Sequence, residues 1–239
     1  MNAFIDKLSG HVLLPHEDMA WLARECGHVR NVPARTDLIH EGYDVGPLFV
    51  VLSGWACRYQ LLPAGSRQIT AFLMPGDCCD MHLAAEHVMD HNIATLSSCR
   101  IATIPRSRFH HLIETRPALT RALWWSQVVD EGVLRAWIVN MGRRTAVERV
   151  AHLMCELFVR ARNIGLTDDE GLELPLSQTV LADALGLTSV HVNRVLRSLR
   201  QDGVMDFRRG RLVIPSVAKL AQVAGFDDQY LQRRTLAAA

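Results

Sequence analysis

The chain has 239 residues, which exceeds what one small domain needs and allows two packed cores. Apolar residues make up 49% of it and charged residues 21%, and no stretch of about 18 uncharged apolar residues is present to cross a membrane. The N-terminus has no basic start followed by an apolar stretch, so we expect no secretory signal, a cytoplasmic location without membrane association, and six reduced cysteines.

Short β-type runs dominate the chain from about residue 30 to residue 105, after a helical start. Most of these runs end at residues that favour turns, above all Gly and Pro. Short strands with this regular punctuation predict a sandwich, barrel or jelly roll. The runs cover residues 48–52, 55–62, 68–73 and 93–104.

A seven-residue repeat begins after Pro117. Small and apolar residues follow one another at alternating steps of four and three, which places them on one face of a helix. A helix buried within one subunit would give the same stripe. We favour a dimerisation helix, because Trp124, Trp137 and Ile138 make other faces apolar as well and these also need cover. The predicted dimer interface consists of Ala118, Ala122, Trp125, Val129, Gly132, Ala136 and Val139.

Residues 178–199 have the pattern of two short helices joined by a tight turn. Ala182 is small where a second helix would cross the first, and Gly186 tolerates the positive φ that a tight turn favours. Thr188 or Ser189 can cap the second helix. The pattern therefore predicts a helix-turn-helix.

Positive charge is concentrated in the second helix of this motif and just beyond it. Between residues 188 and 211 there are six arginines and two aspartates, a balance that suits a polyanionic partner. The outer face of the second helix carries the side chains that would enter a major groove, and a β-hairpin over residues 204–214 with Gly210 at its turn is the expected wing. The predicted base contacts are Ser189, Val190, His191, Asn193 and Arg194. The predicted phosphate contacts are Arg197, Arg200, Arg208, Arg209 and Arg211.

The chain resembles the Crp/Fnr family of bacterial transcription regulators, most specifically over residues 185–196, which read LGLTSVHVNRVL. The resemblance implies an α+β fold. A cyclic-nucleotide-binding-like β-roll (a jelly roll) would occupy residues 1–116, a long dimerisation helix residues 117–142, and a winged helix-turn-helix residues 143–239. It also implies a homodimer that binds palindromic double-stranded DNA and acts together with RNA polymerase.

Individual positions on the second helix follow from the resemblance. Arg194 matches the family's base-contacting Arg, and Ser189 matches a position that contacts DNA in the family. Val190 departs from the family pattern, because many members carry Glu there and read cytosine with it. An apolar Val could touch a thymine methyl group instead. The preferred half-site is therefore left open.

The sensor region departs from the family's cyclic-nucleotide site. Between Gly76 and Leu96 there is no Arg to hold a cyclic phosphate, and a buried phosphate without a charged partner is costly, so we expect no tight binding of cyclic AMP. Only Cys26 lies near the N-terminus, and no two cysteines have the two-residue spacing of cluster ligands, which argues against an iron–sulfur cluster.

Thiols and imidazoles lie close together within residues 78–91 of the sensor region. They could sense a metal, haem or redox signal. The alternative, which we favour, is a filled, ligand-free remnant of a nucleotide pocket, so no metal or other cofactor is assigned. The candidate sensor residues are Cys78, Cys79, His82, His87 and His91.

Two other classes of function compete with a DNA-binding regulator. An enzyme is not expected, because the sequence has no Gly-rich phosphate loop, nucleophile elbow or paired metal-ligand motif. A signalling module that does not bind DNA is the remaining alternative, and the outward arginines of the second helix argue against it.

Overall fold

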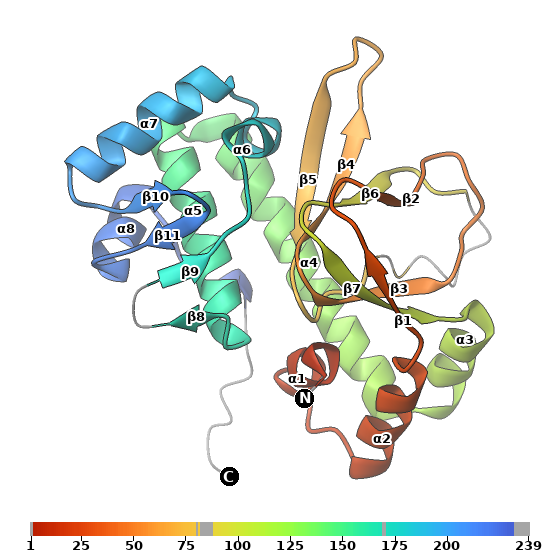
Figure 1. The fold of residues 1–239 in the computed structure, drawn as a ribbon. Helices are drawn as coiled ribbons and strands as arrows, with labels where there is room; N and C mark the ends of the chain where they lie inside the picture. The colour runs from red at the N-terminus through yellow and green to blue at the C-terminus, as the bar shows by residue number, and fades with distance from the viewer. Residues whose placement is uncertain (1, 80, 82–87, 169–170, 232–239) are drawn as a thin grey trace. The chain divides into compact units, whose positions relative to one another are not determined.

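The computed structural model describes residues 2–79, 81, 88–168 and 171–231. These residues form two compact units, each with most of its contacts within itself (Figure 1). The first unit contains the residues up to Gln60 and Thr70–Asp130, and the second contains Leu61–Ile69 and the described residues from Glu131 onward. The division falls inside the long helix α4 (Pro117–Arg143), whereas the sequence predicted domain boundaries at the two ends of that helix.

The first unit is built on two antiparallel sheets, one in the order β1-β7-β3 and one in the order β2-β6-β4-β5. The two sheets agree with the predicted β-roll, and helices α1, α2 and α3 and the first half of α4 belong to the same unit (Figure 1). The elements are α1 (Ala3–Ser9), α2 (His16–Glu25), β1 (Val29–Val32), β2 (Asp37–Ile39), β3 (Leu48–Ser53), β4 (Ala56–Leu61), β5 (Arg67–Leu73), β6 (Asn92–Thr95), β7 (Cys99–Ile104) and α3 (Arg106–Thr115).

Strand β3 separates two hydrophobic clusters, because successive side chains of a strand point to opposite faces. Val51 belongs to a cluster drawn from strands of both sheets, and Phe49 packs against it. Leu48 and Val50 belong to the other cluster, which the four helices share with β3 and β7. The continuous apolar run at residues 48–51 thus packs on both of its faces.

The second unit combines helices with a small sheet in the order β10-β11-β9-β8. The short strand β8 ends at Asp168, whose carboxylate accepts a hydrogen bond from the backbone N–H of Gly171 at 2.8 Å. The elements are α5 (Ala146–Asn163), β8 (Thr167–Asp168), β9 (Gly171–Glu173), α6 (Gln178–Leu185), α7 (Ser189–Gln201), β10 (Asp206–Arg208), β11 (Arg211–Val213), α8 (Val217–Ala224) and a 3₁₀ turn (Gln229–Leu231).

A buried carboxylate joins three parts of the second unit. Glu156 of α5 is fully buried, and burial raises the pKa of its carboxyl group. It accepts hydrogen bonds from Trp137 Nε1 of α4 at 3.1 Å, from the Tyr230 hydroxyl at 3.0 Å, and from Arg160 at 3.4 Å. A buried charge persists only where such partners surround it, so this cluster holds the end of α4, helix α5 and the 3₁₀ turn together.

The residues that the sequence assigned to the dimer interface differ in burial, since some are covered by their own chain and others are exposed. Ala118 and Ala122 are 8% and 0% exposed and belong to the first unit's own helix cluster, so no surface is left on them for a partner. Gly132 is buried, and a Cβ placed on it would lie 3.1 Å from the Tyr230 carbonyl oxygen. These three residues are small because their own chain packs against them. Trp125 and Val139 are exposed, and Val129 and Ala136 are half-buried.

The exposed apolar face of α4 lies beside that stripe. Trp124 and Ile138 are 73% and 72% exposed, and Trp125, Val128 and Val139 are exposed next to them. Among the described residues, no helix is long and apolar enough to span a membrane.

Candidate nucleic-acid interface

Helices α6 and α7 form the helix-turn-helix that the sequence predicted. Gly186 ends α6 with φ 61°, and Met141 of α4 lies so close that a Cβ on Gly186 would be 2.6 Å from its Cε. Thr188 caps α7 by accepting a hydrogen bond from the His191 N–H at 3.2 Å, which decides between the two predicted caps. Ala182 is buried at 6% exposure, as a helix crossing needs.

Helix α7 presents a polar outer face opposite its buried side chains Val192, Val195, Leu196 and Leu199. Arg194, Arg197 and Arg200 are exposed, and within the described part of the chain no carboxylate is paired with them. Ser189 and Val190 are exposed at the first turn, with Val190 at 69%, and His191 and Asn193 are half-buried. All five predicted base-contact positions thus have accessible surface at the N-terminal half of α7.

The wing is the β10–β11 hairpin, whose strands pair Arg208 with Arg211 and leave a two-residue loop. The loop residues Arg209 and Gly210 have φ values of 53° and 78°, the pattern of a type I′ turn. Gly adopts this conformation freely, but a side chain such as that of Arg209 does so at a cost of about 1–2 kcal/mol. Strain of this kind tends to persist at functional positions.

The arginines of the wing are not equivalent. Arg211 donates hydrogen bonds to Asp168 at 2.7 Å and to Glu173 at 2.8 Å, and these carboxylates raise the pKa of its guanidinium. Its charge is thus already neutralised within the small sheet, which weighs against the phosphate contact predicted for Arg211. Arg208 pairs with Asp206 but remains 65% exposed in its side chain. Arg209 is exposed at the tip of the wing.

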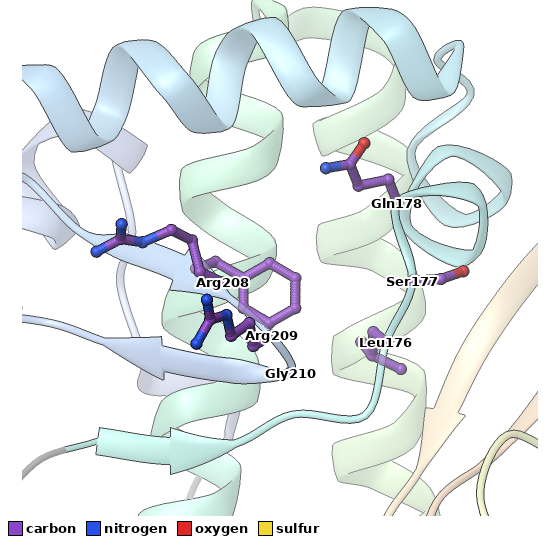
Figure 2. Close-up of a pocket in the computed structure, with 7 residues that line it drawn as sticks. Leu176, Ser177, Gln178, Arg208, Arg209 and Gly210 are labelled. Carbon is purple, nitrogen blue, oxygen red and sulfur yellow. The ribbon is translucent and has the colours of Figure 1, made fainter.

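A hollow of about 690 Å³ lies between the wing and the start of α6 (Figure 2). Arg208 and Arg209 line it from the wing, and Ser177 and Gln178 line it from α6. Ser177 caps α6 by accepting from the Val180 N–H. Guanidinium groups beside a helix N-terminus are the chemistry that binds a phosphate, and of the two here Arg209 is the one not paired with Asp206. Sequence reasoning missed Ser177 and Gln178, although a Ser before a helical segment is a recognisable N-cap signal.

Comparisons with known proteins agree with this geometry. A model of the Crp-like helix-turn-helix domain matches residues 148–223, and a model of the cyclic nucleotide-binding domain matches residues 29–116. The nitrogen fixation regulation protein FixK of Bradyrhizobium diazoefficiens is 34% identical over 176 residues, which cover 73% of this chain and 72% of that protein. The chain belongs to the Crp/Fnr family of transcription regulators.

Other relatives of this Crp/Fnr regulator extend the match. The transcriptional activator protein FnrL of Cereibacter sphaeroides is 25% identical over 215 residues, which cover 88% of this chain and 86% of that protein. The solved structure of FixK2 from Bradyrhizobium japonicum has a TM-score of 0.74 at 24% identity and covers 83% of this chain and 98% of that one. This likeness supports the fold of a β-roll followed by a helix-turn-helix.

Among the candidate sensor residues of this Crp/Fnr regulator, the two adjacent cysteines pack into different clusters. Cys78 packs into the helix cluster, whereas Cys79 belongs to the cluster of the strands, so the two neighbouring thiols point apart. Burial raises the pKa of the Cys78 thiol to about 12, which keeps it protonated and poorly reactive. His91 is buried, and its Nδ1 lies 2.6 Å from Asp90 Oδ1. His82 and His87 lie outside the described residues, and the residues that are described include no group of three His, Cys, Asp or Glu side chains able to hold a metal.

The β-roll of this Crp/Fnr regulator contains an arginine that the sequence argument on cyclic nucleotides did not consider. Arg58 of β4 is half-buried, and its guanidinium donates a hydrogen bond to the Cys79 carbonyl oxygen at 3.0 Å. Arg58 lies on a strand that precedes residues 76–96 in the sequence, so the absence of arginine from that segment does not exclude it from the site. The absence of tight cyclic AMP binding stays a prediction, which calorimetry with the purified protein tests and a micromolar dissociation constant would contradict.

Replacing Arg209 by Asn in this Crp/Fnr regulator is expected to stabilise the fold and weaken DNA binding. Asn tolerates positive φ better than Arg, so the free energy of unfolding rises by up to about 1 kcal/mol. If Arg209 holds one phosphate in each subunit of a dimer, its loss lowers DNA affinity about tenfold or more and reduces the slope of log K against log salt by about 2. Urea unfolding and fluorescence anisotropy at several salt concentrations measure the two effects.

The Arg209→Lys variant is the matched control, since it keeps the charge and the strained backbone. It should retain the stability of the parent chain and most of its DNA affinity. An Arg209→Asn variant that binds DNA like the parent chain at every salt concentration would remove Arg209 from the interface.

Proposed function

We propose that this Crp/Fnr regulator binds two-fold symmetric promoter DNA as a homodimer, with the N-terminal half of each α7 in a major groove. The observation that carries the proposal is the outer face of α7, where Arg194 and Arg197 are exposed and, within the described part of the chain, no carboxylate pairs with them. Arg194 reads a guanine through O6 and N7, and Arg197 and Arg200 hold phosphates. Arg208 and Arg209 add phosphate contacts from the wing.

Homodimerisation rests on the exposed apolar face of α4. Large side chains such as Trp124, Trp125 and Ile138 are exposed along one helix, and a face of this kind is normally covered by a partner. A second copy is the partner we propose, because two parallel α4 helices would bring like faces together about a two-fold axis. The two recognition helices would then meet half-sites about 34–36 Å apart. Contact with RNA polymerase is proposed on the family relationship and has no surface assigned to it.

Selection of bound sequences from a random DNA pool tests this function. The purified chain should enrich a two-fold symmetric motif, and the motif should be the same under reducing and oxidising conditions if the buried cysteines play no part in sensing. A motif found in one redox state only would favour the redox-responsive alternative. Failure to enrich any motif in either state would contradict DNA reading by this chain and would favour a signalling module that does not bind DNA.

Replacing Ile138 by Glu is expected to dissociate the dimer. Burial of one Ile contributes about 1.5–3 kcal/mol, and the two-fold axis doubles this loss, so the dimer dissociation constant rises by about a hundredfold or more. Sedimentation velocity at micromolar concentration measures the change, and affinity for a palindromic site should fall with it. Leu13→Glu is the control, since Leu13 is 79% exposed in the first unit and lies away from α4 in the sequence. An Ile138→Glu variant that sediments as the parent dimer would refute this interface.

A further inference from the structure

One base-contact residue is tied to a neighbouring helix. Asn193 on α7 donates a hydrogen bond from Nδ2 to Oε1 of Gln178, the first residue of α6, at 3.1 Å. The carboxamide of Asn193 therefore has one N–H committed within the protein. Its second N–H and its Oδ1 remain for DNA.

A donor and an acceptor side by side on one amide match a single base edge in the major groove. Adenine presents N7 as an acceptor and the N6 amino group as a donor, so an Asn side chain can bind it with two hydrogen bonds. Guanine presents two acceptors on the same edge and fits only one of these groups. The hydrogen bond to Gln178 fixes which way the Asn193 amide faces, because a flipped amide would bring its Oδ1 against Oε1 of Gln178.

The Gln178 carboxamide must itself be held in one orientation, and a phosphate bound in the hollow would do this. Gln178 lines this hollow together with Arg208 and Arg209, and Figure 2 shows its carboxamide extending from the start of α6 into the space between α7 and the wing. A phosphate held there would accept a hydrogen bond from Nε2 of Gln178 and repel Oε1. The amide oxygen would then face Asn193, as it does in the structure.

We propose that Gln178 is a specificity-determining residue, which transmits the position of a phosphate in the hollow to the carboxamide of Asn193 and so makes Asn193 read an adenine. The inference rests on the proposed function, because it requires α7 to lie in a major groove. Gln178 acts through Asn193 and is a positioning residue, so its loss should change base preference more than overall affinity.

The test uses the full-length dimer and the palindrome selected by the parent chain. Each position of one half-site is replaced in turn by the other three bases, and affinities are measured by fluorescence anisotropy for the parent chain, Asn193→Ala, Gln178→Met and the double variant. The parent chain should prefer adenine about 5-fold to 100-fold at one position. Asn193→Ala should lose this preference, Gln178→Met should lose most of it, and the double variant should lose no more than Asn193→Ala. Replacing that adenine by 7-deazaadenine, which lacks the N7 acceptor, should weaken binding by the parent chain and not by Asn193→Ala.

Gln201→Met is the matched control, because it makes the same chemical change at a glutamine that is exposed at the other end of α7. It should leave the base preference intact, and thermal unfolding should show that all variants are folded. A Gln178→Met variant with the parent base preference would overturn the inference while the proposed function stands. The same holds if the half-site position affected by Asn193→Ala prefers a base other than adenine in the parent chain. A parent chain that selects no motif would instead defeat the proposed function itself.

Discussion

Replacing Arg194 by Ala is expected to remove most of the sequence-specific DNA affinity. Arg194 is exposed on the outer face of α7, in the second turn after the capped N-terminus, and it pairs with no carboxylate of the described residues. A guanidinium bound to O6 and N7 of guanine contributes about 1–3 kcal/mol of discrimination, and a two-fold symmetric complex contains this contact twice. The affinity for the selected palindrome should therefore fall by about 30-fold to 10,000-fold.

Arg200→Ala is the control for charge, since Arg200 is an exposed arginine in the last turn of the same helix. Its loss should weaken binding to selected and random duplexes by a similar factor, as a phosphate contact does. Arg194→Ala should weaken binding to the selected duplex far more than binding to random DNA. Equal losses on both duplexes for both variants would show that Arg194 reads no base.

Replacing Glu156 by Ala is expected to reduce the free energy of unfolding by about 3–5 kcal/mol. The change leaves Arg160, the Trp137 indole N–H and the Tyr230 hydroxyl without their shared acceptor. Urea unfolding followed by far-ultraviolet circular dichroism measures the loss. Glu156→Gln should cost less, because the amide oxygen still accepts a hydrogen bond.

The chain offers a matched control for this variant. Glu131 and Arg135 also form a pair four residues apart on a helix, with the same nitrogen-to-oxygen distance of 3.4 Å as Glu156 and Arg160. The two pairs differ in burial, since the Glu131 side chain is 57% exposed and the Glu156 side chain is fully buried. Glu131→Ala should change the free energy of unfolding by less than about 1 kcal/mol. Equal effects of the two variants would contradict a structural role for the buried cluster.

Local patterns predicted the helix-turn-helix well, because its determinants are close in the sequence. Ala182 and Gly186 are required by the crossing of two adjacent helices, and Thr188 caps the helix that it precedes. The continuous apolar run at β3 likewise predicts, from neighbouring residues alone, a strand buried on both faces. These features are set by neighbouring residues and do not depend on contacts with residues that are distant in the sequence.

Sequence patterns could not identify partners that are distant in the sequence. The spacing indicated that Ala118 and Gly132 pack closely against another element. It could not indicate that this element belongs to the same chain. The count of arginines could not reveal that Arg211 meets Asp168, 43 residues earlier. In the same way, Cys78 and Cys79 are adjacent in the chain and yet pack into different clusters, one shared with helices and the other formed by strands.

The burial of every cysteine makes this protein a natural subject for thiol-exchange measurements. All six cysteines are free thiols shielded from solvent, so a thiol-specific reagent can label the native chain only when a region opens. Cys155 lies in the second unit, and the other five lie in the first. The rate of labelling at each site, read by mass spectrometry, therefore reports the opening of each unit separately within one intact molecule, without any introduced probe.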